Sequence, residues 1–272
     1  MQIDEHPLVE AFSGRIADST RLLAAVMGLS LVDGIFVAVV LAGGLSSIVG
    51  IIEIGVLIFG GSATVAILLG HDESIREQVV SILLIGVVII PIAAVQSVLA
   101  VLVESALNLE IFRRFAGLVI IAIAAKIASA KISDYIPKPS VIILFGLVAS
   151  LELSGFTVDF TADTGLFLRG AAAASVGILF ALLIAVTAPY LRENVDVDRF
   201  RFGSAVALAM LALPILGISD PNLPIALLIL GVSAILAYSP PPEKEDGGRK
   251  IESNEEESPE SDTTETQRQP WM

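Results

Sequence analysis

Apolar segments separated by short polar breaks run through most of this chain. Between residues 22 and 238, charged side chains fall almost entirely at the breaks. Backbone amides in hydrocarbon must be satisfied within their own segment, so each apolar segment is predicted to be an α-helix. The pattern therefore predicts an all-α fold, a polytopic transmembrane bundle of about eight helices. The eight predicted helices cover residues 22–41, 48–69, 79–103, 115–130, 141–154, 170–191, 202–218 and 223–238.

The fourth and fifth predicted helices are short. A helix needs about 20 residues to cross a bilayer. We expect Lys131 and Lys138 to extend these two helices by snorkelling to the interface, or the two segments to be broken or re-entrant pieces.

Both ends of the chain are polar. Residues 1–21 carry apolar side chains at roughly helical spacing, which predicts a short helix on the membrane surface. Acids outnumber arginines there and no small-residue cleavage site follows, so we expect this segment to be retained rather than removed as a signal peptide. Residues 239–272 cannot bury a core and are predicted to form a disordered acidic tail, with an acidic docking segment as the alternative.

Composition supports a membrane location. Hydrophobic residues make up 55% of the 272 and charged residues only 17%, and the mean hydropathy is +0.84; together these values indicate an integral membrane protein. The net charge of −13 comes mostly from outside the apolar segments, since ten of the 29 acidic residues lie beyond Tyr238. The absence of cysteine excludes disulfides, thiolate metal sites and thiol nucleophiles.

The distribution of lysine and arginine predicts the orientation. With eight alternating helices, twelve of the cations outside the helices fall on the side of the two termini, and three, Arg113, Arg114 and Arg169, fall on the other. Cytoplasmic loops carry the excess of positive charge, so both termini are predicted to be cytoplasmic in a multi-pass protein of the cell membrane.

An internal repeat is predicted from recurring sequence. Gly60, Gly146 and Gly231 stand in similar apolar surroundings at spacings of 86 and 85 residues (146−60 and 231−146). Two of the copies also share the order RF, apolar segment, ISD, prolines, apolar segment. Units of three, three and two helices follow, and an odd number of helices would invert the second unit relative to the first, as in many transporters. Chance agreement among low-complexity apolar segments is the alternative.

Two charged residues lie near the centres of predicted helices. Asp33 is the twelfth residue of the first helix (33−21) and Lys126 the twelfth of the fourth (126−114). Charges at this depth are costly and persist with a partner or a function. Asp33 and Lys126 are therefore predicted to form either a structural ion pair or a site at which a proton or cation binds Asp33 and releases Lys126. The small residues of 60–63, 122–130 and 171–175 are predicted to be helix-packing positions.

Three further carboxylates are predicted at the outer ends of helices. Glu53, Glu104 and Glu152 are candidates for an outward-facing cation vestibule, with ordinary interfacial carboxylates as the alternative. The alternative is preferred for Glu104, which lies at a helix end. Glu152 lies inside a short predicted helix and is the stronger candidate.

Catalytic motifs are missing from the sequence. The two histidines, His6 and His71, lie outside the predicted helices, and His71 is nine residues from Ser62 (71−62), more than two helical turns away. A metalloprotease motif, a P-loop and a dinucleotide fingerprint are also absent. We expect a protein that is not an enzyme and that has no cofactor; whether it holds a metal stays open.

The apolar region, with LLAAVMGLSLVDGIFVAVVLAGGL, LIFGGSATVAILLG and RFRFGSAVALAMLALPILG, resembles an uncharacterised multi-pass membrane family of haloarchaea. That resemblance implies no function. The segment LSLVDGIFVAVVLAGGL is more loosely similar to the LysE/TerC-like exporters of metal ions and amino acids, which have repeated helix triplets and an acidic residue matching Asp33. The second acidic residue of such exporters is replaced by Lys126.

Of three classes of function, the missing catalytic motifs argue against a membrane enzyme, and two classes remain open. One is a secondary transporter or exporter of a cation or small solute that uses Asp33 and Lys126, with Glu53 and Glu152 as further binding candidates. The other is a structural or regulatory membrane protein that transports nothing. The expected partners are the lipid bilayer and a cation or small solute, and no nucleic acid.

Overall fold

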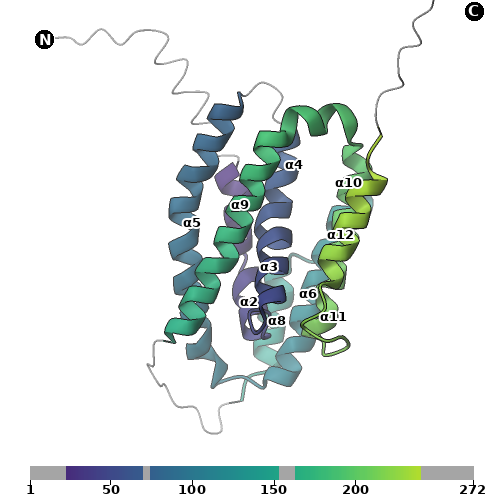
Figure 1. Cartoon of the computed structure of the whole chain (residues 1–272). Helices are drawn as coiled ribbons and strands as arrows, with labels where there is room; N and C mark the ends of the chain where they lie inside the picture. Colours follow the sequence, from purple (N-terminus) through teal and green to yellow (C-terminus); the bar gives the residue numbers. More distant parts are fainter. Residues whose placement is uncertain (1–22, 70–73, 153–162, 240–272) are drawn as a thin grey trace, which may run out of the picture. The chain divides into compact units, whose positions relative to one another are not determined.

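The computed structural model describes residues 23–69, 74–152 and 163–239 (Figure 1). These residues form helices joined by short connections, with two isolated β-bridges and no β-strand among them. The all-α prediction is therefore confirmed for the described part of the chain. The first described helix is Leu23–Val32. It is followed by α2 (Ile35–Leu41), α3 (Ile48–Ile54), the π-helix η1 (Gly55–Gly60), α4 (Gly61–Leu69), α5 (Ile75–Glu104), α6 (Leu109–Ala128), α7 (Ala130–Ser133), α8 (Pro139–Ala149), α9 (Thr164–Asn194), α10 (Val197–Met210), α11 (Ala212–Ile215) and α12 (Ile225–Leu236).

The predicted surface helix at the N-terminus lies outside the described residues. So does the acidic tail apart from its first residue, Ser239.

In the part of the chain that the structure describes, two helices are long and apolar enough to cross a membrane. They are α5, with 30 residues, and α9, with 31. The helix Leu23–Val32 and α2, bent by 42° at the break between them, make a third if they form one span. All eight predicted segments contain helix, but α8 and α12 have only 11 and 12 residues. The apolar helices are thus compatible with a membrane location, and a bundle of eight spanning helices is not confirmed.

Polar residues fix where several helices begin. Ser74 and Glu77 form a reciprocal capping box at the start of α5, and Asn108, Asp163 and Asp196 accept hydrogen bonds from the first backbone amides of α6, α9 and α10. Such caps satisfy the amides that have no partner inside the helix. Helix α6 therefore begins at Leu109, six residues before the predicted start.

The helices α5 and α9 pack against each other in antiparallel orientation (Figure 1). A Cβ at Gly86 would meet Ile178, and one at Gly170 would lie 3.0 Å from the carbonyl oxygen of Ala93. Two arginines tie α9 to the N-terminal helices: Arg169 donates to the carbonyl oxygen of Leu45 (3.3 Å), and Arg192 donates to that of Ile67 (2.6 Å). Helix α9 thus fixes both ends of the segment that contains α3, η1 and α4.

Small residues bring η1 and α9 into close contact. A Cβ at Gly60 would lie 2.5 Å from the ring of Phe180, and one at Gly177 would lie 2.7 Å from the carbonyl oxygen of Gly55. The predicted packing role of Gly60 is therefore confirmed. By contrast, a Cβ at Gly231 would meet no atom within 4 Å, so this copy of the predicted repeat does not share the packing role, and the repeat itself is not confirmed.

Candidate functional site

Asp33 lies at a break in the first helix, where the sequence predicted an unbroken segment. Its neighbour Gly34 has φ of 74°, in the left-handed region that glycine adopts without steric cost. The helix Leu23–Val32 therefore ends just before Asp33, and α2 starts just after Gly34. The Asp33 side chain is half-buried and forms no hydrogen bond or ion pair with any described residue.

The break frees backbone groups that other helices must satisfy. Gln96 on α5 donates from Nε2 to the carbonyl oxygen of Leu31 at 3.2 Å. Its other amide atom, Oε1, is buried and lacks a hydrogen-bond partner in the described part of the chain. Polar side chains of neighbouring helices are a common means of tolerating a break inside a membrane helix. Gln96 therefore supports the broken helix beside Asp33.

Lys126 lies in the last turn of α6, not at its centre. The helix starts earlier and ends sooner than predicted, which moves Lys126 to within two residues of Ala128. A cation in the last turn interacts favourably with the helix dipole. The ion pairs among the described residues are Arg114–Glu110, Arg199–Asp196 and Arg201–Asp198. The structure therefore does not join Asp33 to Lys126, and the predicted pair is absent from it.

Glu53 caps a helix that is distant in sequence. Its side chain is 2% exposed, and Oε1 accepts hydrogen bonds from the backbone amides of Ala226 (3.0 Å) and Leu227 (3.4 Å) at the start of α12. The N-cap residue of α12 itself, Pro224, offers no side-chain acceptor. Glu53 thus supplies the negative charge that the N-terminus of α12 favours.

The predicted carboxylate vestibule is not assembled. Glu104 and Glu152 are exposed at the end of α5 and beyond the end of α8, whereas Glu53 is buried. Within the described residues, no three acidic or histidine side chains are grouped so as to hold a metal ion. Glu152 is fixed through its backbone amide, which donates to the carbonyl oxygen of Ala106 at 2.8 Å. Its role in binding stays a prediction.

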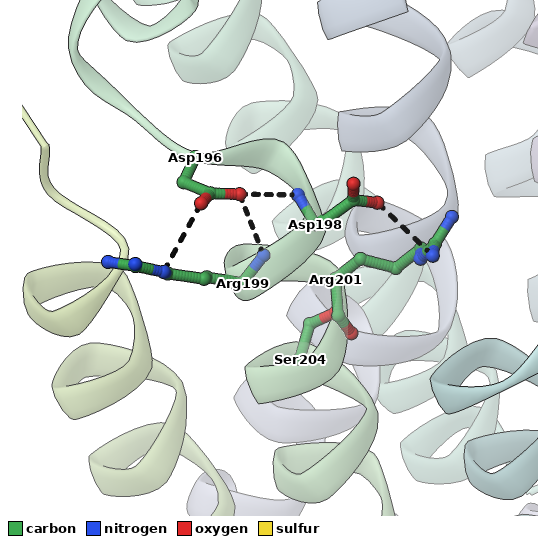
Figure 2. Close-up of polar contacts among 5 residues, drawn as sticks. All are labelled: Asp196, Asp198, Arg199, Arg201 and Ser204. Atoms are coloured by element: carbon green, nitrogen blue, oxygen red, sulfur yellow. Dashed lines mark hydrogen bonds and ion pairs between the residues drawn. The ribbon is translucent and has the colours of Figure 1, made fainter.

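A cavity of about 610 Å³, named here the Lys126 cavity, lies among the helix Leu23–Val32, the start of α2, η1, α4, α6, α9, α10 and α12. Its walls are mostly apolar, and the charged side chains that line it are Lys126 and Arg201. Arg201 lies in the second turn of α10, close to the Asp196 cap (Figure 2). Its Nη2 atom is 3.2 Å from Oδ1 of Asp198, and that carboxylate is 84% exposed. The cavity thus has a cationic rim and an apolar interior.

Residues 89–216 match a family of unknown function (DUF5794). The matched region runs from within α5 to the residue after α11 and contains both cations of the Lys126 cavity, but neither Asp33 nor Glu53. No curated protein and no solved structure matches the chain. The family description carries no activity.

A second cleft, of about 350 Å³, is named here the Arg113 cleft. It is lined by the turn between α2 and α3, the first turns of α6 and the connection between α11 and α12. Arg113 and Arg114 line it together with Glu110 and Glu53. Ser47, also in the lining, donates to the carbonyl oxygen of Pro221 at 2.8 Å and so joins two of these segments.

The two hollows lie on the same helices but at opposite ends. The Arg113 cleft involves the first turns of α6 and the Lys126 cavity its last turns. The cleft reaches Glu53 on α3 and Leu211 after α10, and the cavity reaches Val56 on η1 and Leu208 on α10. Three residues of helix rise about 4.5 Å. On these two walls, therefore, a barrier of about one helical turn separates the hollows.

Sequence reasoning missed Arg201 and Arg113 as lining residues. Both stand in polar stretches that resemble ordinary interfacial loops, and the sequence predicts for Arg201 only a contribution to the orientation and to the RF order of the predicted repeat. The available signal is their position just before an apolar segment: Arg201 stands in the order RF with Phe202, and Arg113 directly precedes the matching pair Arg114-Phe115. This signal predicts a cation near the start of an apolar helix, but it does not reveal which helices face each other.

Proposed function

We propose that this chain is an integral membrane protein that works as a secondary transporter or exporter of a small solute. The proposed path follows the helices α3–η1, α6 and α10, from the Lys126 cavity at one end to the Arg113 cleft at the other. The observation that carries the proposal is the thin barrier between the two hollows, at Glu53 and Val56 on one wall and Leu208 and Leu211 on the other. A solute path that is closed by one thin barrier between two hollows can open alternately to either side through small helix movements.

Two irregular helices beside the path support this function. The first helix is broken at Asp33-Gly34, and η1 is a π-helix of six residues whose Val56, Leu57 and Ile58 line the Lys126 cavity. Broken helices mark substrate and ion sites in transporters, and π-helical segments are frequent at functional sites. In this proposal Lys126 contacts the solute, and Asp33 binds a coupling proton or cation at the break.

The predicted orientation assigns a side to each hollow. Arg201 and Lys126 belong to the end that carries most of the cations, and Arg113 and Arg114 to the end with few. The positive-inside rule then directs the Lys126 cavity to the cytoplasm and the Arg113 cleft to the outside. The proposal includes no catalytic role.

Cysteine accessibility tests this path directly, because the chain contains no cysteine of its own. Single variants Ser204→Cys in the Lys126 cavity and Ser46→Cys in the Arg113 cleft would be labelled with a membrane-impermeant maleimide in right-side-out and inverted vesicles. We expect Ser204→Cys to react only from the cytoplasmic side and Ser46→Cys only from the outside. Reaction of both from the same side would contradict the path.

Labelling of a residue at the barrier distinguishes transport from a purely structural role. Leu208 lies where the Lys126 cavity ends. A transporter that opens alternately to the two sides should expose the cysteine of the Leu208→Cys variant to the maleimide from both sides. A non-transporting protein should expose it from one side or from neither. Leu228→Cys is the matched control, since Leu228 lies on α12 with 64% of its surface exposed on the outside of the helices. The cysteine of the Leu228→Cys variant, at a position that faces lipid in this proposal, should stay unlabelled from both sides.

A further inference from the structure

The walls of the Lys126 cavity offer different chemistry at its rim and in its interior. Lys126 in the last turn of α6 and Arg201 in the second turn of α10 both line the cavity. Ile120 and Leu208, about two turns further into the same helices, line its interior. Both cations thus stand at one end of a cavity whose other walls are mainly aliphatic and aromatic.

The uncharged polar groups of the cavity are already occupied as donors. Thr64 donates to the carbonyl oxygen of Gly60 (2.9 Å), Ser30 to that of Met27 (3.1 Å), and Ser204 to that of Arg201 (2.9 Å; Figure 2). Hydroxyl groups held in this way can still accept hydrogen bonds but have no proton left to donate. A bound acceptor group must therefore be held by Lys126 and Arg201.

The two cations have capacity for such a group. No described residue forms a hydrogen bond or ion pair with the ammonium of Lys126. Arg201 gives one contact to Asp198, whose carboxylate is almost fully exposed, and a guanidinium has five N–H donors. Among the described residues, no acidic side chain lines the cavity. The half-buried ammonium of Lys126 beside apolar walls favours an anionic partner, because even partial burial of an unpaired charge is costly.

We propose that the Lys126 cavity binds an organic anion with an apolar body, such as an acyl-chain carboxylate. The anionic group lies between Lys126 and Arg201, and the apolar body fills the interior between η1, α6 and α10. A volume of about 610 Å³ is within the range of sites that bury most of a small organic ligand. This inference rests on the proposed transport function and names the class of its substrate.

Binding of a fluorescent acyl carboxylate, 11-(dansylamino)undecanoate, to the purified full-length chain in an uncharged detergent tests the inference. Its methyl ester is the uncharged control probe. We expect the carboxylate to bind at least tenfold more tightly than the ester, and Lys126→Gln to remove most of that difference while leaving the ester unchanged. Equal affinities of carboxylate and ester, or an unaltered carboxylate affinity in Lys126→Gln, would overturn the assignment.

Matched variants distinguish the site from general charge effects. Lys131→Gln and Arg199→Gln remove cations that do not line the cavity, and we expect affinities within twofold of the unaltered protein. Ser204→Leu narrows the cavity and keeps both cations, so it should weaken carboxylate and ester alike. This variant tests the cavity even if Lys126→Gln fails to fold, and a Ser204→Leu protein that binds both probes normally would contradict binding there.

Competition identifies the source of the anion. Displacement of the probe by laurate points to a free carboxylate, and displacement by phosphatidylglycerol points to a lipid; either supports the binding of an amphipathic anion. Displacement by neither would refute it. Because the cysteine labelling of the two hollows is measured without any anion, a failure of this inference and a failure of the transport path are distinguishable.

Discussion

Replacing Glu53 by leucine should destabilise the attachment of α12. The change removes the acceptor of two backbone amides, those of Ala226 at 3.0 Å and Leu227 at 3.4 Å. A hydrogen bond to a charged group contributes about 1.5–3 kcal/mol, and the longer bond contributes about 0.5 kcal/mol or less. Removal of a buried carboxylate also relieves its desolvation cost, which offsets part of this loss. A net destabilisation of about 2 kcal/mol remains.

Glu53→Gln separates the hydrogen bond from the charge. Glutamine keeps a carbonyl oxygen that can accept from Ala226, loses the attraction between the carboxylate and the helix dipole, and relieves most of the desolvation cost. The dipole term is at most about 2 kcal/mol in a partly buried site. These two changes oppose each other, so we expect Glu53→Gln to lie within about 1 kcal/mol of the unaltered protein.

Two measurements check this pair of variants. Thermal unfolding in detergent, followed by circular dichroism, should show Glu53→Leu lower in Tm by about 4–8 °C, from about 2–4 °C per kcal/mol for a chain of this size. Hydrogen exchange read by mass spectrometry should show faster exchange at the start of α12 in Glu53→Leu only. Glu104→Leu, at an exposed position, is the control. An unaltered Tm and unaltered exchange in Glu53→Leu would refute the capping role.

Two glycine substitutions test the packing and the helix break. Gly177→Ala should destabilise the protein by about 1–3 kcal/mol in the same unfolding assay, because the new Cβ would overlap Phe59. Gly231 has open space around it, so Gly231→Ala should leave the Tm unchanged. Equal Tm values for the two variants would contradict the close contact of η1 and α9. Gly34→Ala should lower the free energy of unfolding by about 1–2 kcal/mol, because φ is 74° at this position. The control is Gly28→Ala in the preceding helix, where a Cβ would meet no atom within 4 Å; this variant should be neutral or stabilising. A neutral Gly34→Ala would argue against the left-handed break beside Asp33.

The helices could be predicted from the sequence because the apolar segments are compatible with a membrane location, and a segment in hydrocarbon has no alternative to helix. Their limits were harder to predict. Helix α6 extends back to Leu109 through Glu110, Arg113 and Arg114, a stretch that resembles a loop because it is charged. The structure shows why it is helical: Asn108 caps it, and Glu110 pairs with Arg114 four residues later at 2.9 Å. The earlier start, together with an end at Ala128, two residues sooner than predicted (130−128), puts Lys126 in the last turn rather than near the centre.

The candidate site could be predicted only in part, because its walls come from segments that are distant in sequence. Lys126 was predicted as a charge with a function, but its companion Arg201 lies 75 residues away (201−126) on another helix. The amide partners of Glu53 lie 173 and 174 residues away. A single sequence contains no information on which helices face each other, so burial could be expected for these charges but the neighbours of each could not.

Asp33 and Glu53 show why the neighbours decide the interpretation. Both are acids in apolar segments, and insertion cost alone makes them equal candidates for a function. Glu53 meets two amides and the positive end of α12, so its buried charge is compensated within the structure. Asp33 stands at a break supported by Gln96, with no described partner for its carboxylate. The cost of keeping an acid at this position is therefore not offset by the described structure, and Asp33 remains the better candidate for a coupling proton or cation.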